Sequence, residues 1–304
     1  MREETAGRER WPTKTEYADA VQDPRSAFAE PRLQEGVVEQ GPLGMPLTSS
    51  GRNAVVFRLQ GPDGLVAVRC MTREPAEGAR RYGALARHLE RSPCSVLTAA
   101  QWVPRGILVR GAWWPVVLMP WVPGGTLDTV VRRHLGTADA LLHLAANWRV
   151  VVEQLRRSGV GHGDLQHGNV LVDDDLRLQL VDLDSVWVPG AGDWPRAESG
   201  HPDYQHPRQE LRAKGFALDA FSASVIFLSV LAVASDRALW ELHTQENLIF
   251  RADDFAHPGS TDVWRQLRDS PDRYVRALTE ALAADCGRAA EHARGPEELL
   301  ADVR

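Results

Sequence analysis

The sequence predicts an α+β protein with two lobes: a small antiparallel β-sheet lobe carrying one helix, and a larger, mainly helical lobe. Three observations predict this architecture. Short apolar runs separated by turn residues fill positions 53–119. A Pro-Gly-Gly break follows at 123–125. Beyond the break, apolar residues recur at helical spacing. We therefore expect an N-terminal extension at 1–42, a small lobe at 43–122 and a large lobe at 123–304.

The extension is polar and rich in Pro and Gly, with isolated aromatic residues at Trp11, Tyr17 and Phe28. This composition leaves room for one short helix. A partly ordered tail is one interpretation. The other is a strap that docks Trp11 and Phe28 on the body of the protein. We favour the strap, because exposed aromatic surface is costly to leave unburied.

In the small lobe, two β-hairpins and one helix are expected. The first hairpin turns at the Gly-Pro-Asp-Gly sequence of residues 61–64, and the second turns at Gly111. Apolar residues at helical spacing predict the helix, which Pro93 ends. The expected ranges are strands at 54–59, 65–69, 106–110 and 114–119, and a helix at 76–90.

The large lobe begins with an amphipathic helix at 139–158, which Gly159 is placed to cap. Residues 219–234 are apolar nearly all round, which predicts a buried helix. Two or more helices follow to the C-terminus. Between the first two helices, Asp173, Asp174 and Asp175 indicate a solvated hairpin turn between two short strands.

Three polar residues in this stretch suit phosphoryl transfer. Asp164 and Asn169 lie five positions apart in one loop, and the predicted hairpin brings Asp182 back towards them. The transition state of phosphoryl transfer is highly charged, so catalysis depends on positioning and neutralisation. Asn169 and Asp182 offer the oxygen ligands that Mg²⁺ prefers. Asp164 suits the carboxylate that orients an acceptor hydroxyl and takes its proton.

The octapeptide His-Gly-Asp-Leu-Gln-His-Gly-Asn at 162–169 resembles the catalytic loop of protein kinases, and Asp182 resembles the Asp of their Asp-Phe-Gly motif. Aminoglycoside and choline kinases have a similar His-Gly-Asp loop. Three further segments follow the family order, so the resemblance covers roughly residues 43–235. These are the hinge-like 119–127, the activation-segment end at 200–207 and the helix start at 219–222.

The resemblance implies ATP and Mg²⁺ as cofactors and a bilobal protein-kinase-like fold. It implies that Asp219 braces the catalytic loop and that His162 packs beneath it. Asp184 replaces a family Gly and adds a second acidic metal ligand beside Asn169 and Asp182. The implied nucleotide contacts are Gly51, Ala67, Arg69, Met119, Trp121 and Val122, with Arg69 at the phosphates and Trp121–Val122 at adenine.

The small lobe departs from the family pattern. Residues 49–56 replace the glycine-rich loop and keep only Gly51. Arg69 stands where the phosphate-holding Lys belongs, and its planar fork is not a point charge on a flexible stem. The Glu that pairs with that Lys has no clear counterpart, since the helix offers Gly83 near that place and Glu77 only at a distance.

The large lobe departs as well. Gly163 replaces the Arg that senses a phosphorylated activation segment, so control by such phosphorylation is not expected. Gln166 replaces a Lys that steadies the transferring phosphate. Arg208 replaces a Glu, so a family salt bridge is lost.

Other patterns narrow the class of partner. The net charge of −6 gives no support to nucleic-acid binding. Cys70, Cys94 and Cys286 are too scattered for a zinc or disulfide framework, and the N-terminus has no apolar core. No apolar run is long enough to cross a membrane. We therefore expect reduced thiols and a cytoplasmic protein. The resemblance, through the segment at 200–207, implies a protein substrate or signalling partner.

Four histidines could also suggest zinc. His162 and His167, like His201 and His206, are spaced by five residues. A kinase-like loop accounts for them without a metal, and we favour that interpretation.

Three functions remain open. The first is an ATP-dependent phosphotransferase acting on a protein Ser/Thr hydroxyl, supported by Asp164, Asn169 and Asp182. The second is a pseudokinase, a binding or scaffold module, supported by Arg69 and the thin glycine loop. The third is a small-molecule kinase, supported by Asp184 but opposed by the segment at 200–207, which small-molecule kinases lack.

Overall fold

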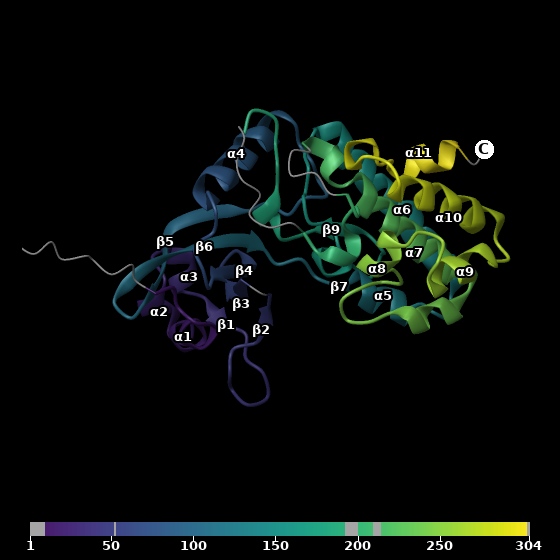
Figure 1. Ribbon diagram of the computed structural model, residues 1–304. Helices are drawn as coiled ribbons and strands as arrows, with labels where there is room; N and C mark the ends of the chain where they lie inside the picture. The colour runs from purple at the N-terminus through teal and green to yellow at the C-terminus, as the bar shows by residue number, and fades with distance from the viewer. Residues whose placement is uncertain (1–9, 52, 192–199, 209–213, 303–304) are drawn as a thin grey trace, which may run out of the picture. The chain divides into compact units, whose positions relative to one another are not determined.

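The computed structural model describes residues 10–51, 53–191, 200–208 and 214–302 (Figure 1). It divides the chain into two compact units. The first, here the β unit, comprises Met1–Gly83 and Ala99–Trp121. The second, the helical unit, comprises Ala84–Thr98 and Val122–Arg304. An antiparallel sheet and a larger helical region confirm the predicted α+β class.

The sheet of the β unit is antiparallel throughout. Its strands run in the order β1-β3-β4-β6-β5, and β2 also pairs with β3. Both predicted hairpins are present, although each strand is longer than expected. Two- and three-residue strands such as β1 and β2 leave no periodic pattern in a sequence, so they were not predicted. The strands are β1 Val37–Val38, β2 Thr48–Ser50, β3 Ala54–Gly61, β4 Gly64–Met71, β5 Gln101–Val109 and β6 Ala112–Pro120.

The N-terminal strap, residues 10–34, forms three short helices where the sequence suggested one. They are α1 Lys14–Ala20, α2 Pro24–Ala27 and α3 Pro31–Gln34. Thr13 caps α1 in a capping box with Glu16. The other two helices begin at a proline, whose fixed φ suits the first helical position. Helices of four residues are too short to show a helical period.

The strap covers one face of the sheet of its own unit (Figure 1). Tyr17, Phe28 and Leu33 are each at most 1% exposed. They share a core with Phe57 and Leu59 of β3. Trp11 packs on Trp114 with ring centroids 5.0 Å apart. The aromatic residues of this segment are therefore docked on the sheet. This confirms the strap interpretation over the partly ordered tail.

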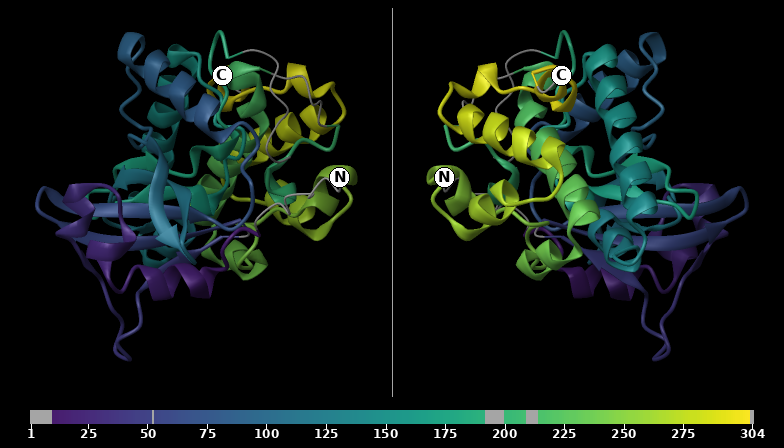
Figure 2. Two further views of the ribbon diagram at one scale, coloured as in Figure 1. Left: turned by 90° about the vertical axis from the view of Figure 1, so that its left-hand side faces the viewer. Right: turned by 90° about the vertical axis from the view of Figure 1, so that its right-hand side faces the viewer.

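The chain between β1 and β2 differs from the strap. Between β1 and β2 the chain forms a loop that projects from the sheet (Figure 2). Leu43 at this loop is 92% exposed and Met45 is 52% exposed. Leu43 and Met45 thus contribute little to the core.

The helical unit is built around α7, which packs against both α6 and α10 (Figures 1 and 2). Gly159 ends α6 in the left-handed conformation with φ of 70°, as its capping role predicts. Trp148 of α6 is 1% exposed, and its indole N–H donates to the carbonyl of Ala223 in α7 at 2.9 Å. The helices are α4 Gly78–Arg91, which crosses the division between the units, α5 Leu127–Arg133, α6 Ala138–Ser158, α7 Ala220–Ser235, α8 Ala252–Ala256, α9 Asp262–Arg268, α10 Arg273–Cys286 and α11 Pro296–Ala301.

A small three-stranded sheet carries the predicted hairpin. Its strands are β7 Gly125–Thr126, β8 Val170–Val172 and β9 Leu178–Leu180, in that spatial order. Asp173 closes the acidic turn, because its carboxylate accepts from the amides of Asp175 and Arg177. The turn is therefore an Asx-type turn, as its composition indicated.

All three cysteines are buried as free thiols. Burial raises the pKa of Cys286 to about 12 and raises the pKa of Cys94 and of Cys70 as well. None of these thiols ionises near neutral pH. Among the described helices, none has the length and apolar character needed to cross a bilayer.

The strap makes a clear prediction for stability. Phe28→Ala should lower the free energy of unfolding by about 3–5 kcal/mol, because it leaves a cavity in a closed core. Leu43→Ala removes an exposed apolar side chain of the same unit and should change stability by less than about 0.5 kcal/mol. Chemical denaturation of both variants measures the difference. Equal midpoints would contradict the docking of the strap.

Candidate functional site

The loop at 162–169 depends on one buried carboxylate. Asp219 is 0% exposed and immediately precedes α7. Its two oxygens accept from the amides of His162 at 2.6 Å and Gly163 at 2.8 Å. Hydrogen bonds to a charged acceptor are roughly twice as strong as neutral ones. The loop backbone is therefore held from below, as the resemblance implied for Asp219.

Gly163 is required by the backbone at its position. Its φ is 81°, and a Cβ there would lie 2.6 Å from the carbonyl oxygen of Ser185. No L side chain fits this approach without displacing the chain. The local packing therefore requires Gly at this position, where the resemblance led us to expect Arg.

His162 supports the loop from inside the protein. Its ring is buried, and Nε2 lies 2.9 Å from the carbonyl oxygen of Val181. A carbonyl only accepts, so Nε2 carries the proton in this contact. The side chain therefore ties the loop to the residue before Asp182, in keeping with the structural role expected of it.

Asp164 and Asn169 are brought into direct contact. The amide nitrogen of Asn169 donates to the carbonyl oxygen of Asp164 at 2.9 Å and to its Oδ2 at 3.1 Å. The other carboxylate oxygen of Asp164 accepts from the amide of His201 at 2.8 Å. Both oxygens of Asp164 are thereby oriented, and the two donations by Asn169 fix the direction of its remaining amide oxygen.

Asp182 follows β9 in a conformation that is uncommon for a residue other than Gly. Its φ and ψ are 62° and 73°. Strained backbone conformations of this kind persist only where the surrounding structure enforces them, and they are concentrated at functional sites. The amide of Val181 donates to the carbonyl of Asn169 at 3.0 Å, which sets the chain before Asp182 beside Asn169. Asp184 lies in the 3₁₀ turn Leu183–Ser185 that follows.

The donor chemistry at this loop fits a hard divalent cation. Asn169 and Asp182 supply amide and carboxylate oxygens, which Mg²⁺ prefers over nitrogen or sulfur. The oriented amide of Asn169 is the observation that supports the fit. Within the described part of the chain, no group of three or more His, Cys, Asp and Glu side chains could hold a metal by itself.

The predicted nucleotide contacts of the β unit share one face of its sheet. Ala67 pairs with Met119 and with Arg58, and Arg69 pairs with Val117 and with Val56. Directly paired residues project from the same face, and residues two apart along a strand do so too. Arg69, Ala67 and Met119 thus lie together on the face opposite the strap, whose partners are Phe57, Val68 and Leu118.

Trp121 and Val122 follow β6. The amide of Trp121 donates to the carbonyl of Leu65 at 3.0 Å, and the guanidinium of Arg58 lies 5.0 Å from the centroid of its indole ring. This cation–π contact fixes the ring within the β unit. Val122 begins the next segment of the helical unit and is half-buried.

The loop at Gly51 differs from a phosphate-binding glycine loop. The amide of Gly51 donates to the carbonyl of Ala54 at 3.1 Å, so it closes the β2–β3 hairpin. A Cβ at Gly51 would meet no atom within 4 Å, so close packing does not require Gly there. Of the segment 49–56, Arg52 lies outside the described residues.

Glu77, the residue just before α4, already has an ion-pair partner. Its carboxylate pairs with Arg80 at 3.1 Å, and its backbone has φ of 55°. On the same helix, Tyr82 stacks on Trp102 with centroids 6.0 Å apart. Glu77 thus has a partner of its own and is a poor substitute for the family's helix Glu.

The segment 200–208 is attached to the loop at 162–169 by contacts that the sequence did not indicate. Nδ1 of His167 lies 2.6 Å from the hydroxyl of Tyr204, and Ser222 donates to the carbonyl of Tyr204 at 2.7 Å. His201 also contacts Glu246 at 3.0 Å. Burial lowers the pKa of His167, so its ring is neutral at neutral pH. Partners 37 residues apart leave no local pattern from which the pair could be predicted.

The four histidines considered for zinc have separate partners. His162 contacts Val181, His167 contacts Tyr204 and His201 contacts Glu246. His206 contacts the carbonyl of Asp285. The structure therefore accounts for each ring by a protein contact.

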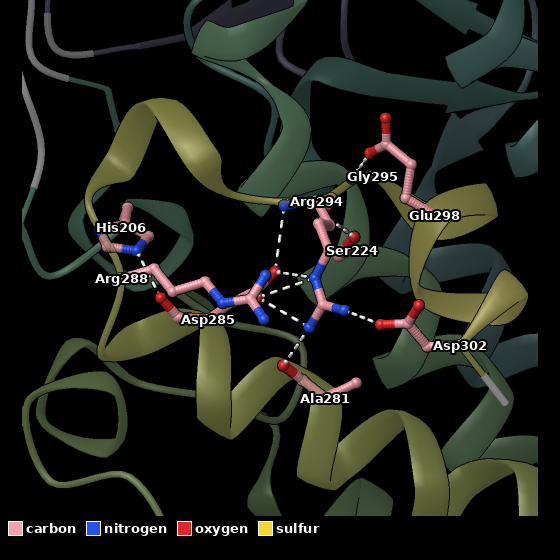
Figure 3. Close-up of polar contacts among 9 residues, drawn as sticks. All are labelled: His206, Ser224, Ala281, Asp285, Arg288, Arg294, Gly295, Glu298 and Asp302. Carbon is pink, nitrogen blue, oxygen red and sulfur yellow. Dashed lines mark hydrogen bonds and ion pairs between the residues drawn. The ribbon is translucent and has the colours of Figure 1, made fainter.

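The end of this segment is fastened to α10 (Figure 3). Nε2 of His206 lies 2.9 Å from the carbonyl of Asp285, and its Nδ1 accepts from the amide of Arg208 at 3.0 Å. Arg208 in turn donates to the carbonyl of Gly287 at 2.9 Å. The carboxylate of Asp285, 0% exposed, pairs with Arg294 at 2.8 Å. Arg208, expected only as a lost salt bridge, is thus part of this attachment.

His206 makes stability depend on pH. Burial lowers its pKa, while the nearby Asp285 opposes the shift. The neutral ring both accepts from Arg208 and donates to Asp285, and protonation removes the acceptor. A lowered pKa in the folded state means that the unfolded chain binds the proton more readily below about pH 6.5. The free energy of unfolding should therefore fall as pH decreases from 7 to 5.

Denaturation of His206→Gln at the two pH values measures this effect. Gln keeps one donor and one acceptor but does not titrate, so the decrease should become smaller. His143→Gln, at an exposed position of α6, should leave the decrease unchanged. An unaltered pH dependence in His206→Gln would contradict the assignment.

Comparisons with known proteins agree with the geometry. The chain is 31% identical over 157 residues to the CBL-interacting serine/threonine-protein kinase 21 of Arabidopsis thaliana, a match that covers 50% of this chain and 37% of that protein. It is 22% identical over 159 residues to the SNF1-like protein kinase ssp2 of Schizosaccharomyces pombe, covering 50% and 27%. It is 30% identical over 121 residues to the hormonally up-regulated neu tumor-associated kinase of Mus musculus, covering 38% and 17%.

These matches span well under half the length of each relative. No protein-family model matches the chain.

Proposed function

Since the chain belongs to the protein-kinase-like superfamily, we propose that it is an ATP- and Mg²⁺-dependent phosphotransferase acting on a Ser or Thr hydroxyl of a protein. The hydrogen-bonded pair of Asp164 and Asn169 beside Asp182 is the observation that carries the proposal. A carboxylate held on both oxygens and an oriented amide are the parts that phosphoryl transfer needs.

Asp164 acts as the base in this proposal. The amides of His201 and Asn169 hold its carboxylate, so the orientation is set before an acceptor arrives. The carboxylate orients the acceptor hydroxyl and takes its proton as the new P–O bond forms. Such a positioned base contributes about 10²–10⁴-fold to a rate.

Asn169 and Asp182 would hold Mg²⁺, with Asp184 as a further acidic ligand. When bound, the ion supplies positive charge that offsets the charge developing on the transferred phosphoryl group. The protein contributes fixed ligand directions. Asn169 is fixed by Asp164, and the chain before Asp182 is fixed by its contact with Asn169.

The nucleotide contacts belong to the same proposal. Ala67 and Met119, paired in register, would contact adenine together with Trp121 and Val122. Arg69 would contact the phosphates from the same sheet face as Ala67. Its guanidinium keeps the positive charge of the expected Lys with a different geometry.

The segment 200–208 favours a protein acceptor. Its residues His201, Tyr204 and His206 each bond to a different part of the helical unit, at Glu246, His167 and Asp285. His201 also bonds directly to Asp164. A fixed segment next to the base suits an extended peptide better than a small molecule enclosed in a pocket.

Transfer of labelled γ-phosphate from ATP and Mg²⁺ to the chain itself or to an added protein tests this function. Asp164→Asn should lower the rate by about 10²–10⁴-fold because it removes the base. Asp182→Ala should give no transfer and serves as the blank. Transfer by Asp164→Asn at the wild-type rate would reject the proposal, and transfer only to added aminoglycoside or choline would favour a small-molecule kinase.

A nucleotide-binding pseudokinase is the second candidate. The amide of Gly51 is used within its own hairpin, and Arg69 stands in place of Lys. Both features would lower the affinity for the phosphates of ATP. Neither changes the sheet face that would contact adenine. Such a module would signal through its shape.

Arg69→Lys separates the two candidates. In an impaired kinase, Lys restores the point charge at the phosphates and should raise the transfer rate by about tenfold or more. In a pseudokinase, neither the variant nor the wild type transfers phosphate. The same assay measures both, with Asp182→Ala again as the blank.

A further inference from the structure

Two hydrogen bonds join the loop that carries the proposed base to the segment 200–208. The amide of His201 donates to Oδ1 of Asp164 at 2.8 Å, and Nδ1 of His167 lies 2.6 Å from the hydroxyl of Tyr204. Asp164 and His167 are three positions apart, and so are His201 and Tyr204. The two bonds therefore connect the same two segments in the same order. All four residues belong to the helical unit.

The hydroxyl of Tyr204 is the donor in the second of these bonds. Tyr204 is fully buried, and burial raises the pKa of its hydroxyl, so the proton stays on the oxygen. The neutral ring of His167 accepts that proton's hydrogen bond at Nδ1. The backbone of Gln245 forms a further hydrogen bond with the same ring. Two parts of the helical unit thus hold the imidazole.

The turn that carries Tyr204 is also fixed by elements other than the loop. Residues Pro202–Tyr204 form a 3₁₀ turn. The hydroxyl of Ser222 in α7 donates to the carbonyl of Tyr204 at 2.7 Å. The carboxylate of Asp203 accepts from the amide of Ala252, the first residue of α8, at 2.8 Å. The turn therefore provides a fixed reference against which the loop is placed.

Within the turn, Tyr204 and His201 are bonded to each other. The amide of Tyr204 donates to the carbonyl of His201 at 3.0 Å, and Nδ1 of His201 accepts from the amide of Asp203 at 3.3 Å. The amide that holds Asp164 thus belongs to the same hydrogen-bonded turn as the hydroxyl that holds His167. Loss of the hydroxyl would release one of these two attachments, so the bond at Asp164 should open more often.

We propose that Tyr204 and His167 are positioning residues for the reaction, which keep the carboxylate of Asp164 in place through His201. Each acts on the base by fixing the segment that orients it. A base that has to be aligned with an acceptor hydroxyl loses rate steeply when its position varies. This inference rests on the proposed function, because it takes Asp164 as the base.

Tyr204→Phe tests the inference, because it removes the hydroxyl and keeps the ring. In the transfer assay, with the same acceptor protein throughout, kcat should fall by about tenfold, the factor expected when one buried hydrogen bond is left unmade. The KM for ATP should stay within about twofold, since Tyr204 is not among the proposed nucleotide contacts.

Hydrogen exchange of the His201 amide, followed by NMR on the full chain without nucleotide, is a readout independent of activity. In Tyr204→Phe this amide should exchange about tenfold faster, because its bond to Asp164 opens more often. The amide of Ile226, buried within α7, reports on unfolding of the whole unit. Its exchange should accelerate less than that of His201.

Further variants serve as controls. His167→Leu should lower kcat about as much as Tyr204→Phe, and combining the two should add little, because both remove the same hydrogen bond. His167→Asn places an amide oxygen near the position of Nδ1 and should keep most of the rate. Tyr274→Phe is the matched control. Tyr274 is 40% exposed on α10, and its hydroxyl accepts from Arg273 at 2.9 Å. Its loss should change neither kcat nor the exchange of His201.

Two results would overturn the inference and leave the proposed function standing. One is a kcat of Tyr204→Phe within about twofold of the wild-type value. The other is exchange at His201 that accelerates no more than exchange at Ile226, which would mean that Tyr204 only stabilises the unit as a whole. A wild type that transfers no phosphate would reject the proposed function, and this inference would fail with it.

Discussion

The buried carboxylate of Asp219 is the constraint on which the candidate site depends. It is fully buried and accepts from two consecutive amides, those of His162 and Gly163. Breaking such an arrangement costs the full desolvation penalty of the charge, so Asp219 ties the loop firmly to the start of α7. A chain of hydrogen bonds leads from His162 of this loop to the other residues of the candidate site. His162 reaches Val181, Val181 reaches the carbonyl of Asn169, and Asn169 holds Asp164.

The far end of the segment 200–208 is held by the main-chain carbonyl of a residue whose own carboxylate is buried. Asp285 of α10 pairs with Arg294, and its own carbonyl contacts His206 (Figure 3). Arg208 adds a bond to Gly287. The segment is thus held at one end by Asp164 and His167 and at the other by α10. Departures from the family pattern at Arg208 and Gly163 come with local packing that accommodates them.

The β unit uses its sheet on both faces. One face is closed by Tyr17, Phe28 and Leu33 of the strap, all buried with Phe57 and Leu59. The other carries Ala67, Arg69 and Met119. Burial of large aromatic and aliphatic side chains is worth about 1.5–3 kcal/mol each. The strap is therefore part of this unit, and the β2–β3 loop gains a contact with it through Lys14.

The sequence alone determined the order of the main strands and helices, the cap at Gly159, the buried character of α7 and the residues of the loop at 162–169. Those features are local, because periodicity, turn residues and motif spacing are all read within a few positions. Only the tertiary structure decided that Tyr204 meets His167, that His201 holds Asp164, that Glu77 pairs with Arg80 and that Lys14 reaches Gly51. Short helices in the strap and two-residue strands were likewise beyond prediction. Most of these contacts join residues far apart in the chain, and all of them form only when packing sets the side chains at bonding distance, which no single stretch of sequence specifies.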